Sequence, residues 1–436
     1  MKTLIKNVHI LTMDDQNTII PNGYLIIEDD CILKIGPMNE LTISNIDQII
    51  EGNDGILMPG MINSHTHLAM IPFRGLGDDT VDRLRKFLIP MEQKWMDKEL
   101  VYLATKYAIA ESLLAGVTTV VDMYYFIDEM IQASKELGIR AFVGQTIMEE
   151  KTCDFNSPLD ALYYIEEKLN EPHDKLVTPF IAPHATTTCC KETLQKAYKI
   201  AKKYDTIFSL HVAEMDYEMT YFKNSKYQTP IQYLNDIGVL DHKSLLAHCI
   251  HLNDHDIEII KEKKAKVSHC IGSNTKAAKG IAPLTKLIEK DIAVSLGTDG
   301  PASGNTLDIL TQYKLVANFH KYQNKDRNAW KALDIISLAT KTAAKTIHLE
   351  KKVGQIKAGM QADLTILETT SMNMFPIYDL ASAIVYSANQ NNVCDVFVAG
   401  KHIVKNKQLV DYDVKQLRQD LLQKMNQTEF IPIKRA

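Results

Sequence analysis

Two histidines, His65 and His67, stand one residue apart where an apolar run ends, in the stretch GILMPGMINSHTHLAM (residues 55–70). Apolar runs of this kind usually become buried strands. Two imidazoles buried side by side are costly unless something binds them. Because residues i and i+2 of a strand project to the same face, about 6–7 Å apart, both rings can converge on one cation if the strand end bends.

Other side chains that can bind a metal or move a proton stand at the ends of further apolar runs. They are His184 in IAPHATTT, His211 and Glu214 in LHVAE, His248 in LLAHC and Asp299 in LGTDG. In a barrel, His211 and Asp299 can reach the histidine pair from the opposite side. Three histidines and one aspartate suit Zn²⁺, and an Fe²⁺ site of the same composition is also possible. A water bound to such a metal has a lowered pKa and becomes a nucleophile near neutral pH.

The elements that must position these residues are eight short apolar runs separated by helix-period stretches such as KETLQKAYKIAKKYD. The runs span residues 56–63, 116–123, 140–147, 177–183, 206–212, 244–249, 266–271 and 292–298. Eight strand–helix units predict a (β/α)8 TIM barrel, whose active site lies at the C-terminal ends of the strands. Five of these ends carry His, Glu or Asp, and we expect these side chains to share one rim.

Strand patterns at both ends of the chain predict a second, smaller unit. Alternation and Gly, Asn or Asp breaks mark strands in TLIKNVHILTM and GYLIIEDDCILKIGP, and strand patterns return in ADLTILE and CDVFVAGKHIVKN. We therefore predict a β-sandwich domain built from residues 1–56 and 350–436 beside a barrel of residues 57–349. The second part also includes a C-terminal helix over DVKQLRQDLLQKMN.

Composition excludes several classes of protein. The chain of 436 residues has a formal net charge of −5 and no dense Lys/Arg cluster, which argues against nucleic-acid binding. No apolar run approaches the roughly 20 residues that span a bilayer, and the N-terminus lacks the apolar segment of a signal peptide. Seven scattered cysteines without CxxC spacing argue against a disulfide framework or a Cys-rich zinc site. We expect a cytoplasmic protein without a nucleic-acid or membrane partner.

Single residues of this set also have ordinary structural interpretations. Asp299 alone could cap a helix, because Gly300 and Pro301 follow, and Glu214 alone could lie on a solvated face. An isolated histidine is more often a hydrogen-bonded structural residue than a ligand. We assign that surface or structural role to His251, His255, His269 and His320.

The motifs PGMINSHTH, LHVAE, LLAHC and SLGTDG together resemble the amidohydrolase superfamily over nearly the whole chain. The resemblance includes the return to the small domain in GQIKAGMQADLTIL. Binuclear members of that superfamily carry a metal-bridging Lys at the end of strand 4. Here that strand, VTPFIAPH, ends in His184 and has no Lys. The resemblance therefore implies the mononuclear branch, which contains purine and pyrimidine deaminases and triazine hydrolases.

Within that branch the chain is most similar to the 5-methylthioadenosine/S-adenosylhomocysteine deaminase family. The similar stretches are HTHLAMIPFRGLGDDTVDRLRKFLIPMEQKWM, HCIGSNTKAAKGIAPL and GTDGPASGNTLDIL. The resemblance implies that Glu92 binds the ribose hydroxyls, that His184 contacts the substrate and that Ser303 lies in the substrate site. Gln145, in RAFVGQTIM, stands where many members carry an Arg near the amino-acid tail of the substrate. Since Gln offers no charged fork to a carboxylate, smaller 5′-modified adenosines are favoured over S-adenosylhomocysteine.

The reaction that the resemblance implies is hydrolytic deamination at C6 of adenine, with one divalent metal ion per subunit held by His65, His67, His211 and Asp299. Asp299 would take a proton from the attacking water, helped by His248, and Glu214 would protonate N1. The products would be an inosine analogue and ammonia. Association into a homo-oligomer is left open, because it rests on analogy with other barrels.

Sibling activities are the alternative, namely guanine deaminase or a triazine-type hydrolase, since siblings share segments like LHVAE. Glu92 argues against both, and against cytosine deaminase, because their substrates have no ribose diol. The combined H-x-E and P-C-x-x-C signature of the unrelated zinc nucleobase deaminases is absent, since the chain has no P-C-x-x-C. A noncatalytic amidohydrolase-like protein is a different class, and the complete set of candidate ligands argues against it.

Overall fold

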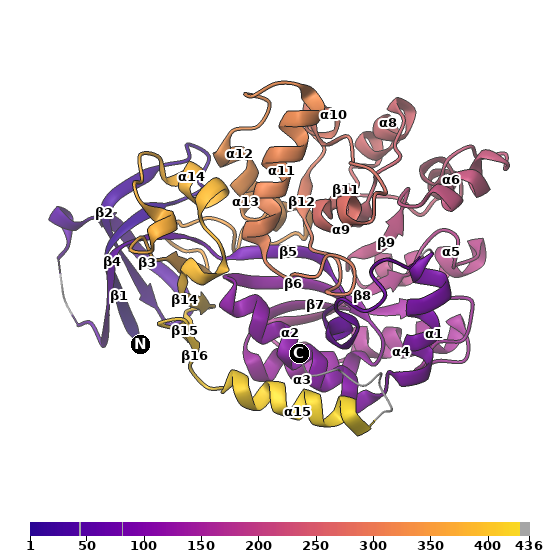
Figure 1. Ribbon diagram of the computed structural model, residues 1–436, viewed down its shortest axis with the longest axis horizontal. Coiled ribbons are helices and arrows are strands. Elements are labelled where there is room, and N and C mark those ends of the chain that lie inside the picture. The colour runs from indigo at the N-terminus through magenta and orange to yellow at the C-terminus, as the bar shows by residue number, and fades with distance from the viewer. Residues whose placement is uncertain (43–44, 81, 428–436) are drawn as a thin grey trace.

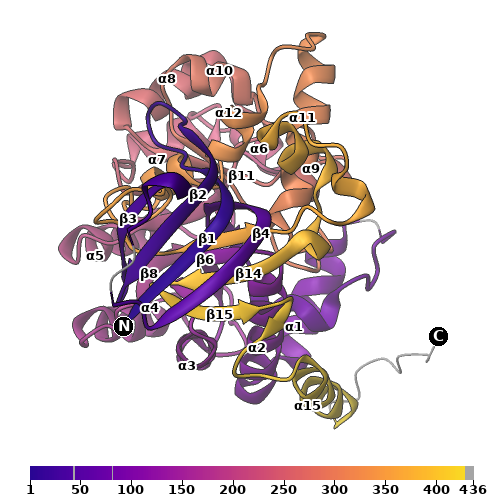
Figure 2. The ribbon, with the colours of Figure 1, turned by 90° about the vertical axis from the view of Figure 1, so that its left-hand side faces the viewer.

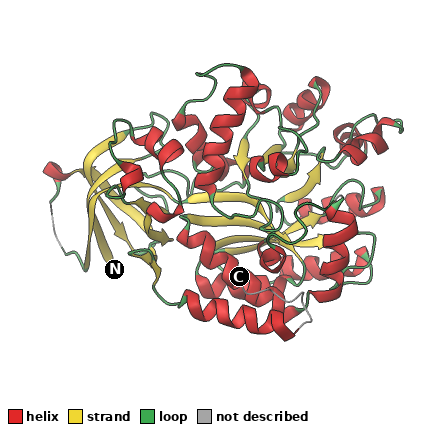
Figure 3. Ribbon diagram, viewed as in Figure 1, coloured by secondary structure: helices red, strands yellow, loops and turns green. Residues whose placement is uncertain are grey.

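The computed structural model describes residues 1–42, 45–80 and 82–427. Its larger part is a barrel surrounded by helices, and a smaller curved sheet adjoins one side of the barrel (Figures 1 and 3). Both termini of the chain contribute strands to that smaller sheet. The architecture is therefore the predicted (β/α)8 barrel with an attached β unit built from both chain ends.

The barrel sheet has eight strands in the order β12-β11-β10-β9-β8-β7-β6-β5, and its neighbouring strands pair in parallel. The first and last strands meet where Ser64 Oγ donates to Leu296 O (2.9 Å) and Asp299 N donates to His65 O (3.1 Å). Each predicted run overlaps one barrel strand: β5 (Met61–Thr66), β6 (Val117–Tyr124), β7 (Arg140–Ile147), β8 (Val177–Pro183), β9 (Phe208–Val212), β10 (Ser244–His248), β11 (Lys266–His269) and β12 (Val294–Leu296).

Helices connect these strands around the outside of the barrel (Figure 3). Their starts follow the local sequence: Asp97 caps α2, Ser157 caps α4 with proline at the first helical position, and Asn253 forms a capping box at α8. The longer barrel helices are α2 (Lys98–Leu114), α3 (Ile127–Leu137), α4 (Pro158–Asn170), α5 (Lys191–Lys203), α8 (Asp254–Lys263) and α11 (Ile309–Asn324). Shorter ones are α1 (Ile89–Trp95), α6 (Asp216–Lys223), α7 (Pro230–Asp236), α9 (Ile271–Lys276), α10 (Leu284–Glu289), α12 (Ala332–Ser337) and α13 (Lys341–Thr346).

The smaller sheet has the strand order β16-β15-β14-β13-β4-β1-β2-β3, so the strands from the two chain ends form two halves that meet at β13 and β4 (Figure 2). Strand β13 pairs antiparallel with β4, and β4 pairs in parallel with β1. Its strands are β1 (Lys2–Leu11), β2 (Ile19–Glu28), β3 (Cys31–Pro37), β4 (Gln48–Pro59), β13 (Leu364–Leu367), β14 (Val393–Val398), β15 (Lys401–Lys405) and β16 (Gln408–Leu409). The predicted domain limits at residues 57 and 350 stay a prediction.

The junction between the two units is tight. The predicted run 56–63 divides at Gly60, since β4 ends at Pro59 in the small sheet and β5 begins at Met61 in the barrel. A Cβ at Gly60 would lie 2.2 Å from Thr118 Cγ2, so only glycine fits this crossing. Arg140 at the start of β7 donates two hydrogen bonds of 2.9 Å to the Asp363 carboxylate beside β13. This buried bidentate pair ties the barrel to the small sheet.

The C-terminal helix that the sequence predicts is α15 (Val414–Gln427), which runs along α2 on the outside of the barrel (Figure 1). Lys424 of α15 pairs with Asp97 and Glu99 at the start of α2, at 2.8 Å each. Among the residues that the structure describes, no helix has both the length and the apolar character that crossing a membrane requires.

Candidate active site

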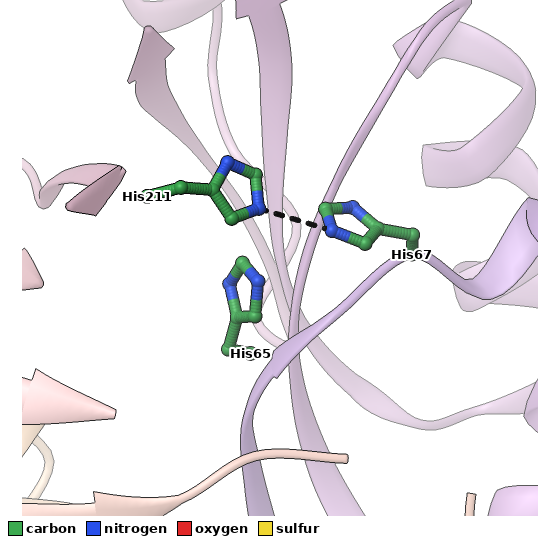
Figure 4. A group of neighbouring side chains, drawn as sticks. All are labelled: His65, His67 and His211. Carbon is green, nitrogen blue, oxygen red and sulfur yellow. Dashed lines mark hydrogen bonds between the residues drawn. The ribbon is translucent and has the colours of Figure 1, made fainter. Parts of the chain in front are cut away.

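Three of the four predicted metal ligands bring their ring nitrogens together at the C-terminal ends of β5 and β9 (Figure 4). His67 Nδ1 lies 2.7 Å from Met123 O, and His211 Nδ1 lies 2.6 Å from His184 O. Because a carbonyl only accepts, each Nδ1 carries the hydrogen and each Nε2 keeps a lone pair. These two Nε2 atoms face each other at 3.2 Å.

His65, the third histidine of this group, and Asp299, the fourth predicted ligand, complete the cluster. His65 Nε2 is buried and has no hydrogen-bond partner. Asp299 Oδ1 lies 3.2 Å from His67 Nε2 and 3.9 Å from His65 Nε2. Facing lone pairs, an orphaned buried nitrogen and an adjacent carboxylate together fit a bound divalent cation, because a cation satisfies all four donors at once.

The backbone at these strand ends adopts conformations that place the side chains on the rim. Ala213, His248 and Asp299 have φ values of 51°, 71° and 60°, in the left-handed region that non-glycine residues seldom occupy. Such strained positions concentrate at functional sites. Gly297, just after β12, lies so close to β5 that a Cβ would be 2.8 Å from His65 O. The sequence LGTDG is therefore suited to bring Asp299 against the histidines.

A cavity of about 300 Å³ opens beside the cluster. Most of the predicted site residues line it, on both sides of the candidate metal position: His67, Glu92, His184, His211, Glu214, His248, Asp299 and Ser303. The structure therefore brings the predicted catalytic and substrate-binding residues together, with one exception described below.

Glu92 of α1 forms one wall of the cavity. Tyr124, at the end of β6, donates a hydrogen bond of 2.6 Å to Glu92 Oε1. Both side chains are buried, and burial raises the pKa of Glu92 to about 7 in spite of this hydrogen bond. Glu92 is thus a carboxyl group that is poised between its neutral and ionised forms near neutral pH.

Glu214 is held from two sides. Its backbone N–H donates to Glu218 Oε2 at 2.9 Å, and its Oε1 accepts a hydrogen bond of 2.5 Å from Lys279 Nζ. His248 Nε2 lies 3.7 Å from the same oxygen. Burial raises the pKa of Glu214, but the charges of His248 and Lys279 outweigh burial and hold this pKa at about 2. Glu214 is therefore a carboxylate in the structure described.

The two further histidines of the rim have fixed orientations. His248 Nδ1 lies 2.9 Å from Asn274 Oδ1, an acceptor, so it carries the hydrogen and Nε2 points toward Glu214. His184 Nδ1 lies 2.9 Å from Thr188 Oγ1. Burial lowers the pKa of His184 to about 4, so its ring is neutral at physiological pH.

Gln145 does not reach the cavity, which corrects its predicted place in the substrate site. It is fully buried in β7, and its side-chain amide donates to Thr146 O (3.0 Å) and Asp154 Oδ2 (2.8 Å). Among the described residues, its neighbour Thr146 lines the cavity instead. The physical reason is strand alternation, since adjacent residues of β7 point to opposite faces.

Several residues that contact the predicted site residues were not singled out from the sequence. Tyr124 and Glu218 hold Glu92 and Glu214, as described above. Ser273 Oγ donates to Asp299 Oδ2 at 2.6 Å, and Asn274 and Lys279 follow in the same segment. The stretch HCIGSNTKAAKGIAPL carried the family resemblance, so it contained a signal for these three, but not for which side chain each would contact. His269 and His320 contact each other through their Nε2 atoms (3.0 Å), consistent with a structural role.

Three histidines and one aspartate converge at the C-terminal strand ends of a (β/α)8 barrel, beside a cavity lined by carboxylates. This arrangement is typical of the metal-dependent barrel hydrolases. Comparison with known proteins gives the family within this class. The sequence profile described as the Amidohydrolase family matches residues 56–403. The chain belongs to the amidohydrolase family, as the sequence motifs indicated.

Individual relatives match over almost their whole length. The 5-methylthioadenosine/S-adenosylhomocysteine deaminase of Thermodesulfovibrio yellowstonii is 37% identical over 418 residues, which cover 94% of this chain and 95% of that protein. The 5′-deoxyadenosine deaminase of Methanosphaera stadtmanae is 33% identical over 430 residues, covering 96% and 98%. The crystal structure of an adenosine deaminase from Xanthomonas campestris with bound zinc has a TM-score of 0.95 at 27% identity, covering 98% of both chains.

Proposed function

We propose that this protein hydrolytically deaminates 5′-modified adenosines at C6, giving the inosine analogue and ammonia. The observation that carries the proposal is that one cavity joins a buried carboxyl group, Glu92, to the cluster of Glu214, His248 and Asp299. A nucleoside needs both ends of such a cavity, one for the ribose diol and one for the ring. The names of the full-length relatives support the same substrate class.

The metal site follows from the donor set. His65, His67, His211 and Asp299 would hold one divalent ion, with Zn²⁺ favoured and Fe²⁺ the alternative. When bound, such an ion supplies an acidified water molecule that is a nucleophile near neutral pH. The zinc-bound relative supports this part of the proposal.

The side chains of this chain perform the proton transfers. Asp299 is ionised, because its interactions with the neighbouring histidines outweigh burial and hold the pKa of Asp299 well below its usual range. It accepts a proton from the attacking water, while His248 Nε2 orients the attacking hydroxyl. Glu214 delivers a proton to N1 and so neutralises the charge that attack at C6 pushes onto the ring. Asp299 then passes the proton it took from water to the amino group, and ammonia leaves. The hydroxyl proton on C6 is released through Asp299 to solvent as the carbonyl of the product forms.

The charges around the cavity favour substrates smaller than S-adenosylhomocysteine. Three Lys or Arg side chains are among the described residues that line it, and each already has an acidic partner. Arg83 and Lys276 pair with Asp78 at 3.3 Å and 2.9 Å, and Lys279 pairs with Glu214. A substrate carboxylate would therefore have to compete with Asp78 and Glu214 for these cations. We propose 5′-methylthioadenosine or 5′-deoxyadenosine as preferred substrates.

Ammonia release by the purified, zinc-loaded protein tests the proposal. The substrates are 5′-methylthioadenosine, S-adenosylhomocysteine, 5′-deoxyadenosine, adenosine, guanine and cytosine. We expect turnover of the 5′-modified adenosines, with S-adenosylhomocysteine slower than the other two. Release from guanine or cytosine alone would overturn the substrate assignment in favour of the sibling activities. Metal content measured on the same preparation tests the ratio of one ion per chain.

The cellular setting is part of the same proposal. Seven dispersed cysteines, all free thiols, support the reducing cytosol as the compartment. A small nucleoside is the only ligand, besides the metal ion, for which the cavity gives an argument.

A further inference from the structure

One short segment after β11 contacts all three groups to which the proposed function gives proton-transfer or orienting roles. Ser273 Oγ donates to Asp299 Oδ2 at 2.6 Å. Asn274 Oδ1 accepts from His248 Nδ1 at 2.9 Å. Lys279 Nζ donates to Glu214 Oε1 at 2.5 Å. The first two contacts fix orientations, whereas the third also places a positive charge against the proposed acid.

Lys279 is held in a turn that aims it at the cavity. Its neighbours Ala278 and Gly280 have φ values of 53° and 123°, both in the left-handed region. Its backbone N–H donates to Asn274 O at 2.9 Å, which ties the turn back to α9. A Cβ at Gly280 would lie 2.8 Å from Ile250 Cγ2, so the turn packs closely against the segment after β10. Lys279 is also mostly buried, with 18% of its side chain exposed.

The chemistry of the purine ring gives this contact a consequence. N1 of adenine has a lone pair and no hydrogen, so it binds a neutral, protonated Glu214. After attack at C6, N1 has taken the proton of Glu214 and become an N–H donor, and N1 of the inosine product also carries a hydrogen. Both later species therefore bind an ionised Glu214, which is the form that Lys279 stabilises.

We propose that Lys279 is a positioning residue that favours the states in which Glu214 has given its proton to N1. This inference rests on the proposed function. In the step concerned, Glu214 O–H breaks and N1–H forms, and the electron pair that C6 gives up to N1 on attack accepts the proton. Glu214 is left as a carboxylate, and Lys279 keeps its own protons. The proton that Glu214 delivers comes from solvent water as the ring binds.

The expected kinetic pattern follows from this difference between states. A hydrogen bond to a charged group is worth roughly 10–100-fold in an equilibrium constant. Removing it with Lys279→Met makes protonated Glu214 easier to form, so KM for the adenosine substrate falls. It also weakens the driving force for proton transfer, so kcat falls by roughly the same factor of 10–100. The inhibition constant of the inosine product stays close to that of wild type, because Glu214 is ionised both in the free protein and in the product complex at neutral pH.

Steady-state kinetics and product inhibition of four proteins test the inference: wild type, Lys279→Met, Lys279→Arg and Lys286→Met. Lys279→Arg keeps the charge and should restore much of kcat and of KM toward the wild-type values. Lys286→Met is the matched control, since it removes an exposed Lys–carboxylate pair with Asp254 (2.7 Å) outside the cavity and should leave kcat, KM and product inhibition unchanged. Lys279→Gln replaces the Met variant if the latter does not fold.

The outcomes separate the inference from the function on which it rests. Wild type that releases no ammonia from any adenosine refutes both. Wild type that is active, with a Lys279→Met variant whose kcat and KM are both unchanged, refutes the inference alone. A higher KM with unchanged kcat also refutes it, because that pattern belongs to a merely structural role. Equal losses in the Met and Arg variants contradict the role of the charge.

Discussion

Replacing Tyr124 by Phe removes the hydrogen bond of 2.6 Å that the phenol donates to Glu92 Oε1, while keeping the aromatic ring. Burial raises the pKa of Glu92 to about 7, so about half of this group is ionised at pH 7. A hydrogen bond to a charged group is worth about 1.5–3 kcal/mol. Its loss therefore lowers the ratio of ionised to neutral Glu92 roughly 10–100-fold.

This change should weaken substrate binding, because the ribose hydroxyls donate hydrogen bonds to an ionised Glu92 in the proposed complex. Apparent affinity scales with the fraction of the protein that is competent to bind, so KM of Tyr124→Phe at neutral pH should rise roughly 5–50-fold. A carboxyl group with a raised pKa is neutral below that pKa and ionised above it. The KM of wild type should therefore rise as pH falls below about 7, and the defect of the variant should shrink as pH is raised.

Steady-state kinetics with 5′-methylthioadenosine from mildly acidic to alkaline pH make the measurement. Tyr125→Phe is the matched control, because the Tyr125 hydroxyl donates to Met148 Sδ (3.7 Å) and makes no hydrogen bond with Glu92. The argument fails if Tyr124→Phe stays within about twofold of wild-type KM at neutral pH, or if its defect does not depend on pH. A decrease in kcat at unchanged KM would also contradict a role in ribose binding.

Three further substitutions test other parts of the molecule. Glu214→Gln should keep its metal content, measured by elemental analysis, and lose roughly 10²–10⁴-fold in kcat, because the amide has no acidic proton to deliver. Full activity of this variant would remove Glu214 from the mechanism. His67→Ala should lower the metal content per chain and abolish the rise in Tm that added zinc gives wild type; an unchanged content would move the metal site elsewhere. Arg140→Ala leaves Asp363 buried without its partner and should lower the free energy of unfolding by about 3–5 kcal/mol in urea titrations. A loss below about 1 kcal/mol would show that the ion pair is not essential for stability.

The barrel was predictable because its signals are local. Each strand is an apolar run, and each reactive residue lies within three residues of its C-terminal end, as with His184 and Asp299. The boundary between β4 and β5 was not predictable in this way. Both strands are buried near Gly60, so hydrophobicity is continuous across the point where the chain leaves one sheet and enters another.

Gln145 shows a different limit of the sequence. All eight residues of β7 are buried, so the polar–apolar alternation that reveals the two faces of a half-exposed strand is missing. Alignment to the family motif gave the position of Gln145 along the strand but could not show that Thr146, one residue later, points into the cavity. Which face a residue of a fully buried strand occupies is decided by the register of the closed barrel, which a single sequence does not reveal.

The ionisation of the two cavity carboxyl groups depends on tertiary contacts, which the sequence motifs do not reveal. Glu92 has a neutral phenol as its hydrogen-bond partner, so burial prevails and raises its pKa to about 7. Glu214 is equally enclosed, but its partner is the Lys279 ammonium, and its pKa is held at about 2. Two carboxyl groups whose pKa values are driven apart can take separate tasks in one site. Neither the barrel nor the candidate metal ligands require a lysine at position 279, so a substitution there can change the balance between substrate binding and proton transfer while the fold is preserved.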